Sequence, residues 1–380
     1  MYHFEPLDAL LDSIPKNYLI PAVDMLILKD GKEIYRHAAG YSDKKRTRPA
    51  GKDDLYAIYS SSKIATCVSA LRLVEQGKLS LEDPVSKYIP AFGDLTVKEE
   101  DGTVRPAKTV MTIRHLMSMQ GGLDYEFDRG NPEEVFGENY RTAGTVDFVS
   151  TFAKAPLLFD PGTHYQYSLC HDVLGAVIEV ASGERFGDFM KRELFDPLGM
   201  KDTGFHPTKE QMERMSYFVR ADYDAYTLTE TGERENPTEN YESGGGGLVS
   251  SVDDYIELIY ALANNGTSRN GYQVLKPETL ELYRTPQLGD VQQADFKRIF
   301  GYMTGYTYCL GVRRMLDNSG LTAAVGNFGW DGAAGFYVLA DPENKIAMIY
   351  AQNVLNSSPT FSLLHGQLRD MMYLCLREWK

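Results

Sequence analysis

The chain has 380 residues, of which 43% are hydrophobic, a length that supports one large domain or two packed subdomains. Lysine and arginine together number 39 against 53 aspartates and glutamates, which gives a formal net charge of −14. A chain this acidic repels phosphate backbones, so nucleic acid is not an expected partner. No uninterrupted apolar run reaches the length of a membrane span.

The cysteines carry no metal or disulfide signal. They are scattered without a CxxC pair, at Cys67, Cys170, Cys309 and Cys375. This spacing favours buried free thiols, and neither a zinc site nor a disulfide framework is expected. No metal and no cofactor are therefore expected.

The N-terminal segment predicts a short amphipathic helix. Its apolar residues repeat at helical spacing, at Phe4, Leu7, Leu10, Leu11 and Ile14. The segment lacks the basic region and pure apolar stretch of a secretory signal, which favours a cytoplasmic location. Residues 23–28 and 33–39 then flank an Asp30-Gly31 turn, which predicts a hairpin.

A short strand over residues 55–59 leads into Ser60-Ser61-Ser62-Lys63, and a helix is predicted from there to Gly77. Further helices are predicted over 112–119, 172–181 and 252–263. The long segments 124–145 and 216–243 lie between these helices, and loops of that length often form walls or lids of a site. We expect their aromatic residues to shape a pocket, namely Tyr125, Phe127, Tyr140, Tyr217, Tyr223, Tyr226 and Tyr241.

The last third of the chain predicts a meander and a final helix. Strands are predicted over 306–315, 323–328, 336–340 and 346–352, and the helix over 363–376. Strands at both ends with helices between them indicate an α+β fold, in which both termini build one antiparallel sheet around an inserted, mostly helical subdomain. We expect a single domain, 1–380, with subdomains at about 1–62 plus 245–380 and at about 63–244.

Three Ser-x-x-Lys tetrads occur, at Ser13…Lys16, Ser42…Lys45 and Ser60…Lys63. Residues three apart share one helix face, so the lysine amine can approach the serine hydroxyl and act as a base or hold a negative partner. Only the third tetrad joins a strand to an amphipathic helix, whose N-terminus favours developing negative charge. Ser60 is therefore the candidate nucleophile, although a serine-rich helix cap would give the same pattern.

Two further segments could supply the base and the oxyanion hole that a hydroxyl nucleophile needs. Residues 162–168 cluster polar side chains, including Tyr167, before a helix, and residues 329–335 interrupt the meander with small residues. Taken singly, these segments are also typical of a capping loop and a tight turn. The run Gly244–Gly247 lacks the order of a phosphate-binding loop and is interpreted as a backbone-packing strand or turn.

Together these motifs resemble the serine β-lactamase and penicillin-binding-protein superfamily, and most closely its class C β-lactamase-like branch, which includes the family VIII carboxylesterases. The matching segments run in order through 55–63, 73–85, 111–116 with 121–123, 161–175, 244–255 and 330–335. The resemblance implies a β-lactamase/transpeptidase-like fold. It also implies a serine hydrolase that acts on a small ester or amide through an acyl-enzyme.

The resemblance assigns the roles position by position. Ser60 would be acylated, Lys63 would tune its proton, and Tyr167 would be the phenolic base. The backbone N–H groups of Ser60 and Ala333 would form the oxyanion hole. A lysine ammonium beside a tyrosine favours the charged phenolate, so Tyr167 is a plausible base near neutral pH.

Two departures from the family pattern bear on the substrate. The second motif usually ends in Asn, but here it reads Tyr167-Ser168-Leu169, and the third usually begins with Lys or His, but here begins with Trp330. Both changes remove polar groups that would hold a β-lactam or a peptide. Leu169, Trp330 and Gly332 are the expected substrate-binding residues, and small esters are the expected substrates. A β-lactamase or a D-Ala-D-Ala peptidase or acyltransferase of the same fold is the alternative.

The sequence disfavours two alternatives of other kinds. A Ser-His-Asp hydrolase is disfavoured because no G-x-S-x-G elbow occurs, although His164 and His171 lie near Tyr167 in sequence and could line the cleft. A non-catalytic binding module would be expected to lose Ser60, Lys63 or Tyr167, and all three are present. The oligomeric state cannot be inferred from the sequence.

Overall fold

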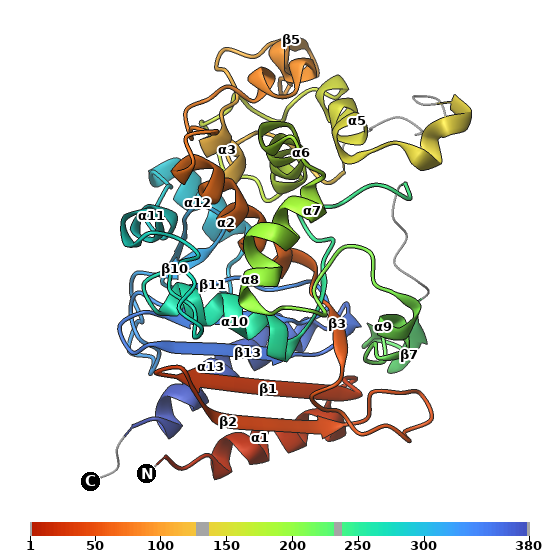
Figure 1. The fold of residues 1–380 in the computed structure, drawn as a ribbon, viewed down its shortest axis with the longest axis vertical. Helices are drawn as coiled ribbons and strands as arrows, with labels where there is room; N and C mark the ends of the chain where they lie inside the picture. The colour runs from red at the N-terminus through yellow and green to blue at the C-terminus, as the bar shows by residue number, and fades with distance from the viewer. Residues whose placement is uncertain (1, 127–136, 232–237, 378–380) are drawn as a thin grey trace.

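The computed structural model describes residues 2–126, 137–231 and 238–377. Both chain termini lie at the end of the molecule that holds a seven-stranded antiparallel sheet (Figure 1). The strand order is β2-β1-β13-β12-β11-β10-β9. The bounds are β1 Ala22–Lys29, β2 Lys32–Gly40, β9 Tyr306–Tyr308, β10 Arg313–Met315, β11 Phe328–Gly329, β12 Tyr337–Asp341 and β13 Ile346–Ala351. The predicted α+β fold, with one antiparallel sheet built from both termini, is confirmed.

Helices cover both faces of this sheet. α10 (Val252–Ala263) contacts β1, β12 and β13. α1 (Glu5–Asn17) contacts β1, β2 and α13 (His365–Cys375), which is preceded by the π-helical turn η7 (Thr360–Leu364). The predicted apolar face of α1 is the buried one, with Leu7, Leu11 and Ile14 fully covered. Because both faces are covered, β12 and β13 are buried along their whole length.

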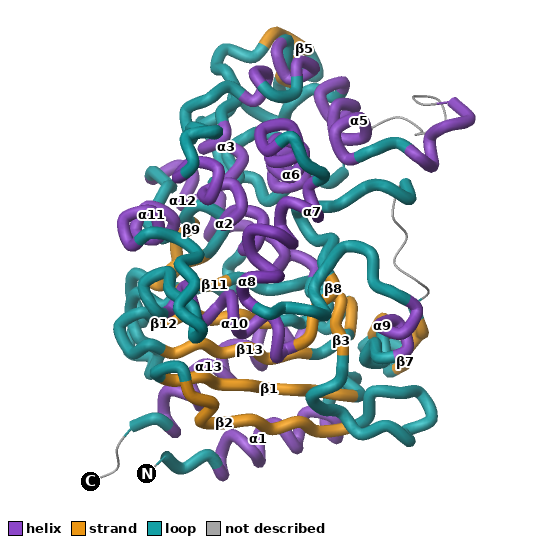
Figure 2. Tube along the Cα trace, viewed as in Figure 1, coloured by secondary structure: helices purple, strands orange, loops and turns teal. Residues whose placement is uncertain are grey.

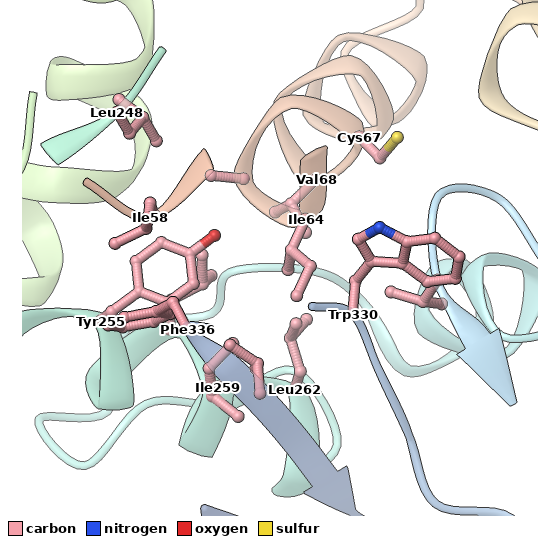
Figure 3. Close-up of a cluster of buried hydrophobic side chains, with 14 of the residues drawn as sticks. Ile58, Ile64, Cys67, Val68, Leu248, Tyr255, Ile259, Leu262, Trp330 and Phe336 are labelled. Atoms are coloured by element: carbon pink, nitrogen blue, oxygen red, sulfur yellow. The ribbon is translucent and has the colours of Figure 1, made fainter. Parts of the chain in front are cut away.

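Most of the other helices lie in the opposite half of the molecule, where loops join them (Figure 2). The longest helices of this half are α2 (Ser62–Glu75) and α6 (Cys170–Ser182), which pack against each other. Figure 3 shows Ile64 of α2 turned toward Leu262 of α10, with Trp330 beside them. α2 is thus a central helix of the core, and its first turn lies where the sheet and the helical part meet.

The remaining elements are short. The helices are α3 Ile113–Met117, α5 Thr145–Ser150, α7 Phe186–Met190, α8 Asp196–Leu198, α9 Lys209–Glu213, α11 Pro277–Tyr283 and α12 Asp290–Ile299. The small sheets pair β3 (Leu55–Ala57) with β8 (Val249–Ser251), β4 (Thr96–Lys98) with β5 (Val104–Pro106), and β6 (Val219–Asp222) with β7 (Thr227–Glu230) and β14 (Val354–Leu355).

Two strand predictions need correction. The segment 306–315 is not one strand but the hairpin of β9 and β10, because the chain reverses at Gly311, whose φ of 100° favours glycine. The segment 323–328 is mostly turn and reaches the sheet only at β11, since Gly326 also has a left-handed φ of 90°. Apolar residues alternate in both segments, so periodicity alone predicts continuous strands and does not reveal the turns.

All four cysteines are buried and free, as predicted. Among the helices that the structure describes, none combines the length and the apolar character needed to cross a membrane. The subdomain boundaries near residues 62 and 245 stay a prediction.

Candidate active site

The turn that carries Ser60 is held between two strands and a helix. β3 pairs with β8, and the N–H of Ile58 donates to the carbonyl of Leu248 at 3.1 Å. A single 3₁₀ turn, η1 (Tyr59–Ser61), then leads into α2. Tyr59 has a left-handed φ of 43°, a conformation that non-glycine residues adopt at a cost. The chain thus turns sharply into α2, with Ser60 at the bend.

The three consecutive serines have different environments. The Ser61 hydroxyl donates to the carbonyl of Phe336 at 3.1 Å, and the Ser62 hydroxyl accepts from the N–H of Leu248 at 3.1 Å. Both side chains are fully buried, whereas Ser60 is partly exposed. Ser61 and Ser62 therefore hold the turn against the residues that precede β12 and β8. Ser60 is the serine of this run that an incoming molecule can reach.

Lys63 is fully buried one helical turn after Ser60. Its Nζ lies 3.2 Å from Ser60 Oγ and 3.3 Å from the Tyr125 hydroxyl, and it also donates to the carbonyl of Gly245. A lysine ammonium has three N–H donors, so these three acceptors match its charged form. A tyrosine hydroxyl ordinarily ionises only near pH 10, so the Tyr125 hydroxyl is a neutral partner near neutral pH.

The glycine run is confirmed as a backbone-packing turn. A Cβ on Gly244 would lie 2.3 Å from the carbonyl oxygen of His171, and one on Gly245 would lie 2.2 Å from a carboxylate oxygen of Asp172. The lack of side chains lets the run press against the start of α6, and from there the Gly245 carbonyl reaches Lys63. The sequence offered no sign that a carbonyl of this run would contact the lysine.

Tyr167 faces Lys63 from the loop before α6. The Lys63 Nζ lies 4.8 Å from the centroid of the Tyr167 ring, and the indole N–H of Trp330 donates to the Tyr167 oxygen at 2.9 Å. The Tyr125 and Tyr167 rings are 5.9 Å apart. The phenol oxygen of Tyr167 therefore accepts a hydrogen bond from Trp330, and its ring lies beside the Lys63 amine.

The segment after β11 approaches the serine turn closely. A Cβ on Gly332 would lie 2.2 Å from the carbonyl oxygen of Ile58, so only glycine fits there. The next residue, Ala333, is exposed, and its N–H makes no hydrogen bond within the part of the chain that the structure describes. Gly332 thus brings an available N–H group beside the turn that carries Ser60.

A buried ion pair lies behind this segment. The Arg313 guanidinium donates to Asp331 at 2.6 Å, and both side chains are less than a tenth exposed. Burial alone would raise the pKa of Asp331, but the Arg313 charge holds it below its usual value. Asp331 is therefore a carboxylate that anchors the residues around Trp330 to β10.

A partly exposed serine, a buried lysine, a tyrosine and a glycine-rich strand end thus meet at one point. The Beta-lactamase family model matches residues 7–369 of the chain. The chain belongs to the beta-lactamase family. The predicted superfamily, its fold and the serine hydrolase class are confirmed by this membership and by the relatives that follow.

The sequence is 28% identical over 395 residues to esterase EstB of Burkholderia gladioli, covering 97% of this chain and 94% of EstB. It is 27% identical over 364 residues to N-acetylmuramyl-L-alanine amidase of Bacillus subtilis, covering 88% and 77% of the two chains. Unliganded simvastatin synthase LovD from Aspergillus terreus has the same fold, with a TM-score of 0.81 at 19% identity over 98% of each chain. Relatives by sequence thus carry esterase and amidase names, and a protein named as a synthase shares the fold.

The expected substrate-binding residues lie at the same site but are well covered. Leu169 precedes α6 and is 6% exposed, and Trp330 is 2% exposed behind Tyr167. Gly332 is buried against Ile58. Direct contact of these three residues with a substrate stays a prediction.

The two histidines near Tyr167 do not join the cluster. His171 is fully buried, its Nε2 lies 3.2 Å from the carbonyl oxygen of Met117, and burial lowers its pKa to about 3. His164 pairs with Asp295 at 2.8 Å on the surface. Within the described residues, neither is recorded in contact with Ser60, which agrees with the sequence argument against a Ser-His-Asp triad.

The prediction that aromatic residues of the long loops shape the pocket holds for Tyr125, which contacts Lys63. Tyr241 is instead buried against Asp172, and Tyr223 meets Ser357 beside the small β6 sheet. Tyr226 is 64% exposed on the turn between β6 and β7. Tyr140 is partly exposed beside Arg141, and Tyr217 lines a cavity with Phe218. Phe127 lies outside the described residues. The contact of Tyr125 could not be inferred from spacing, because it depends on how its loop returns to α2.

Proposed function

We propose that this enzyme is a carboxylesterase that hydrolyses small esters through an acyl-enzyme on Ser60. The observation that carries the proposal is the 3.2 Å contact of Lys63 Nζ with the hydroxyl of Ser60, and the same Nζ lies 4.8 Å from the centre of the Tyr167 ring. A weakly nucleophilic hydroxyl needs such neighbours to lose its proton. The match to EstB over nearly the whole of both chains supports an ester as the substrate.

In the acylation step, Tyr167 takes the proton of Ser60 as Oγ forms its bond to the ester carbonyl carbon. The tetrahedral intermediate then collapses, the bond to the alcohol oxygen breaks, and Tyr167 returns the proton to that oxygen. Lys63 keeps its charge and stabilises the phenolate, as its three acceptors suggest. In deacylation, Tyr167 takes a proton from water as the water oxygen forms its bond to the acyl carbonyl carbon. The bond to Ser60 Oγ then breaks, and Tyr167 returns the proton to that oxygen.

The negative charge that develops on the carbonyl oxygen needs donors fixed in advance. The N–H groups of Ser60 and Ala333 are the proposed oxyanion hole. The support is the close packing of Gly332 on Ile58 and the available N–H of Ala333. Ser60 also lies in the turn that leads into the N-terminus of α2, where the helix dipole favours negative charge.

The experiment combines a fluorophosphonate probe with two matched serine variants. The wild-type protein and Ser13→Ala should be labelled and should hydrolyse p-nitrophenyl butyrate equally well, because Ser13 belongs to a Ser-x-x-Lys tetrad on α1 away from the site. Ser60→Ala should lose labelling and about 10³-fold or more of kcat/KM while retaining the wild-type circular dichroism spectrum. Labelling of a serine other than Ser60, located by peptide mass spectrometry, would refute the proposal.

A further inference from the structure

An uninterrupted series of aromatic rings leads from Tyr167 to the protein surface. The Phe300 ring lies 5.4 Å from that of Tyr167, Tyr302 lies 6.1 Å from Phe300, and Phe361 lies 6.3 Å from Tyr302. We call Tyr167, Phe300, Tyr302 and Phe361 the aromatic row. Its members come from three separate segments: the loop before α6, the residues after α12, and the turn η7.

The row offers an uncharged apolar surface next to the reactive groups. Tyr302 is 44% exposed, and the other three rings are partly exposed. A tyrosine hydroxyl ordinarily ionises only near pH 10, so Tyr302 is neutral near neutral pH. Exposed aromatic surface beside a site is typical of a binding surface.

The chemistry indicates which part of an ester would lie along the row. Tyr167 must deliver its proton to the alcohol oxygen as the ester bond breaks, so that oxygen has to come within hydrogen-bond reach of the Tyr167 hydroxyl. The alcohol part of the ester then continues from Tyr167, and the row begins at the ring of that residue. The acyl part stays at Ser60 after the alcohol has left.

We propose that the aromatic row is the binding site for the alcohol part of the ester and that it selects alkyl and aryl alcohols. This inference rests on the proposed function, because it takes Ser60 as the nucleophile and Tyr167 as the proton donor. Phe300 contacts both Tyr167 and Trp330 and so forms the inner end of the site. Tyr302 and Phe361 form its outer end and determine how large an alcohol gains contact.

The test separates the two halves of the substrate. One series varies the alcohol with acetate held constant, as methyl, n-hexyl and 2-phenylethyl acetate. The other varies the acyl group with methanol held constant, as methyl acetate, hexanoate and 3-phenylpropanoate. The first series passes through a common acetyl-enzyme, so a preference within it reports acylation and not deacylation.

The wild-type enzyme should prefer hexyl and 2-phenylethyl acetate over methyl acetate. Tyr302→Ala and Phe361→Ala should each reduce that preference in kcat/KM by about tenfold, and Tyr302→Phe should retain it because the ring remains. The preference within the methyl ester series should not change in any of these variants. Tyr41→Ala is the matched control, since Tyr41 is 42% exposed on the loop after β2.

Three results would overturn the inference. The preference in kcat/KM could fall equally in the two series, it could fall only in the acyl series, or the alcohol preference could stay unchanged in both alanine variants. The proposed function would survive each of these results as long as acetylated Ser60 is detected by mass spectrometry. If methyl and hexyl acetate yield no acetyl-Ser60, the proposed function itself fails. The two failures are therefore distinguishable in one set of measurements.

Discussion

Lys63, Ser60 and Tyr167 form a connected group, and this has a measurable consequence. Residues that share one proton-transfer step lose activity non-additively. Lys63→Met and Tyr167→Phe should each reduce kcat/KM for p-nitrophenyl butyrate by about 10²–10⁴-fold, and the double variant should be little worse than either. Additive losses would show that the two side chains act in separate steps. Methionine fills the buried volume of Lys63, so thermal unfolding should confirm a folded protein in each case.

Trp330 donates to the phenol oxygen of Tyr167, a contact that can be removed with little loss of packing. Trp330→Phe keeps an aromatic ring but no N–H group. Because this hydrogen bond stabilises the negative charge that Tyr167 carries in the proposed mechanism, its loss should reduce kcat/KM about tenfold to a hundredfold. Thermal unfolding at the wild-type temperature would show that the lost activity does not come from lost packing.

At the scale of elements, the loop between β11 and β12 lies very close to the serine turn at Gly332. No side chain larger than the hydrogen atom of glycine fits between the two segments. Gly332→Ala should push the two apart and misplace the Ala333 N–H, with about a 10²–10³-fold loss in kcat. Gly366 on α13 has no neighbour within 4 Å of an added Cβ, so Gly366→Ala is the matched control. The control should keep full activity and gain about 0.5–1 kcal/mol in the free energy of unfolding. Equal kcat values for the two variants would rule out this role of Gly332.

The helices and strands also show which features of the fold can be predicted from the sequence. α1, α10 and the β1–β2 hairpin were predicted closely, because periodicity and a turn signal act locally. The α11 and α12 helices were not predicted, and the mixture of polar and apolar residues in α12 explains why. At the proposed site, the ordered motifs predicted Ser60, Lys63 and Tyr167, and Lys63 Nζ lies 3.2 Å from Ser60 Oγ and 4.8 Å from the centre of the Tyr167 ring. The contacts of Lys63 with Gly245 and Tyr125 required the tertiary structure, because residues 182 and 62 positions away meet it.

At the scale of the whole molecule, the sheet contains a carboxyl group that links stability to pH. Asp24 on β1 is 1% exposed, and burial raises its pKa to about 6 against the opposing charge of Arg36. The unfolded carboxyl titrates near 3.9, so the native protein binds the extra proton between about pH 4 and pH 6. The contribution of Asp24 to stability is therefore greatest below about pH 4 and declines by about 2 kcal/mol as the pH rises to 6.

Asp24→Asn should remove that decline, which urea unfolding at pH 4, 5, 6 and 7 would measure as the difference between variant and wild type. Arg36 keeps Asp253 as a partner at 2.5 Å, so the variant does not leave an isolated buried charge. A constant difference across the four pH values would contradict the assignment.

The net charge of −14 acts on every substrate that approaches the enzyme, and it distinguishes esters from β-lactams. A cephalosporin carries a carboxylate, whereas a simple ester is neutral, so only the cephalosporin is repelled at long range. Leu169 and Trp330 also lack the polar groups that would hold it, and each unpaired polar group costs about 1–3 kcal/mol. The value of kcat/KM for a butyrate ester should therefore exceed that for a chromogenic cephalosporin by about a hundredfold or more.

Raising the salt from 0.01 M to about 0.15 M shortens the screening length from about 30 Å to about 8 Å, so it should raise the cephalosporin value and leave the ester value constant. Leu169→Asn should lower the ratio of the ester kcat/KM to the cephalosporin kcat/KM, because the asparagine amide restores one polar partner for the cephalosporin. A ratio that favours the cephalosporin would instead identify the protein as a β-lactamase in activity as well as in family.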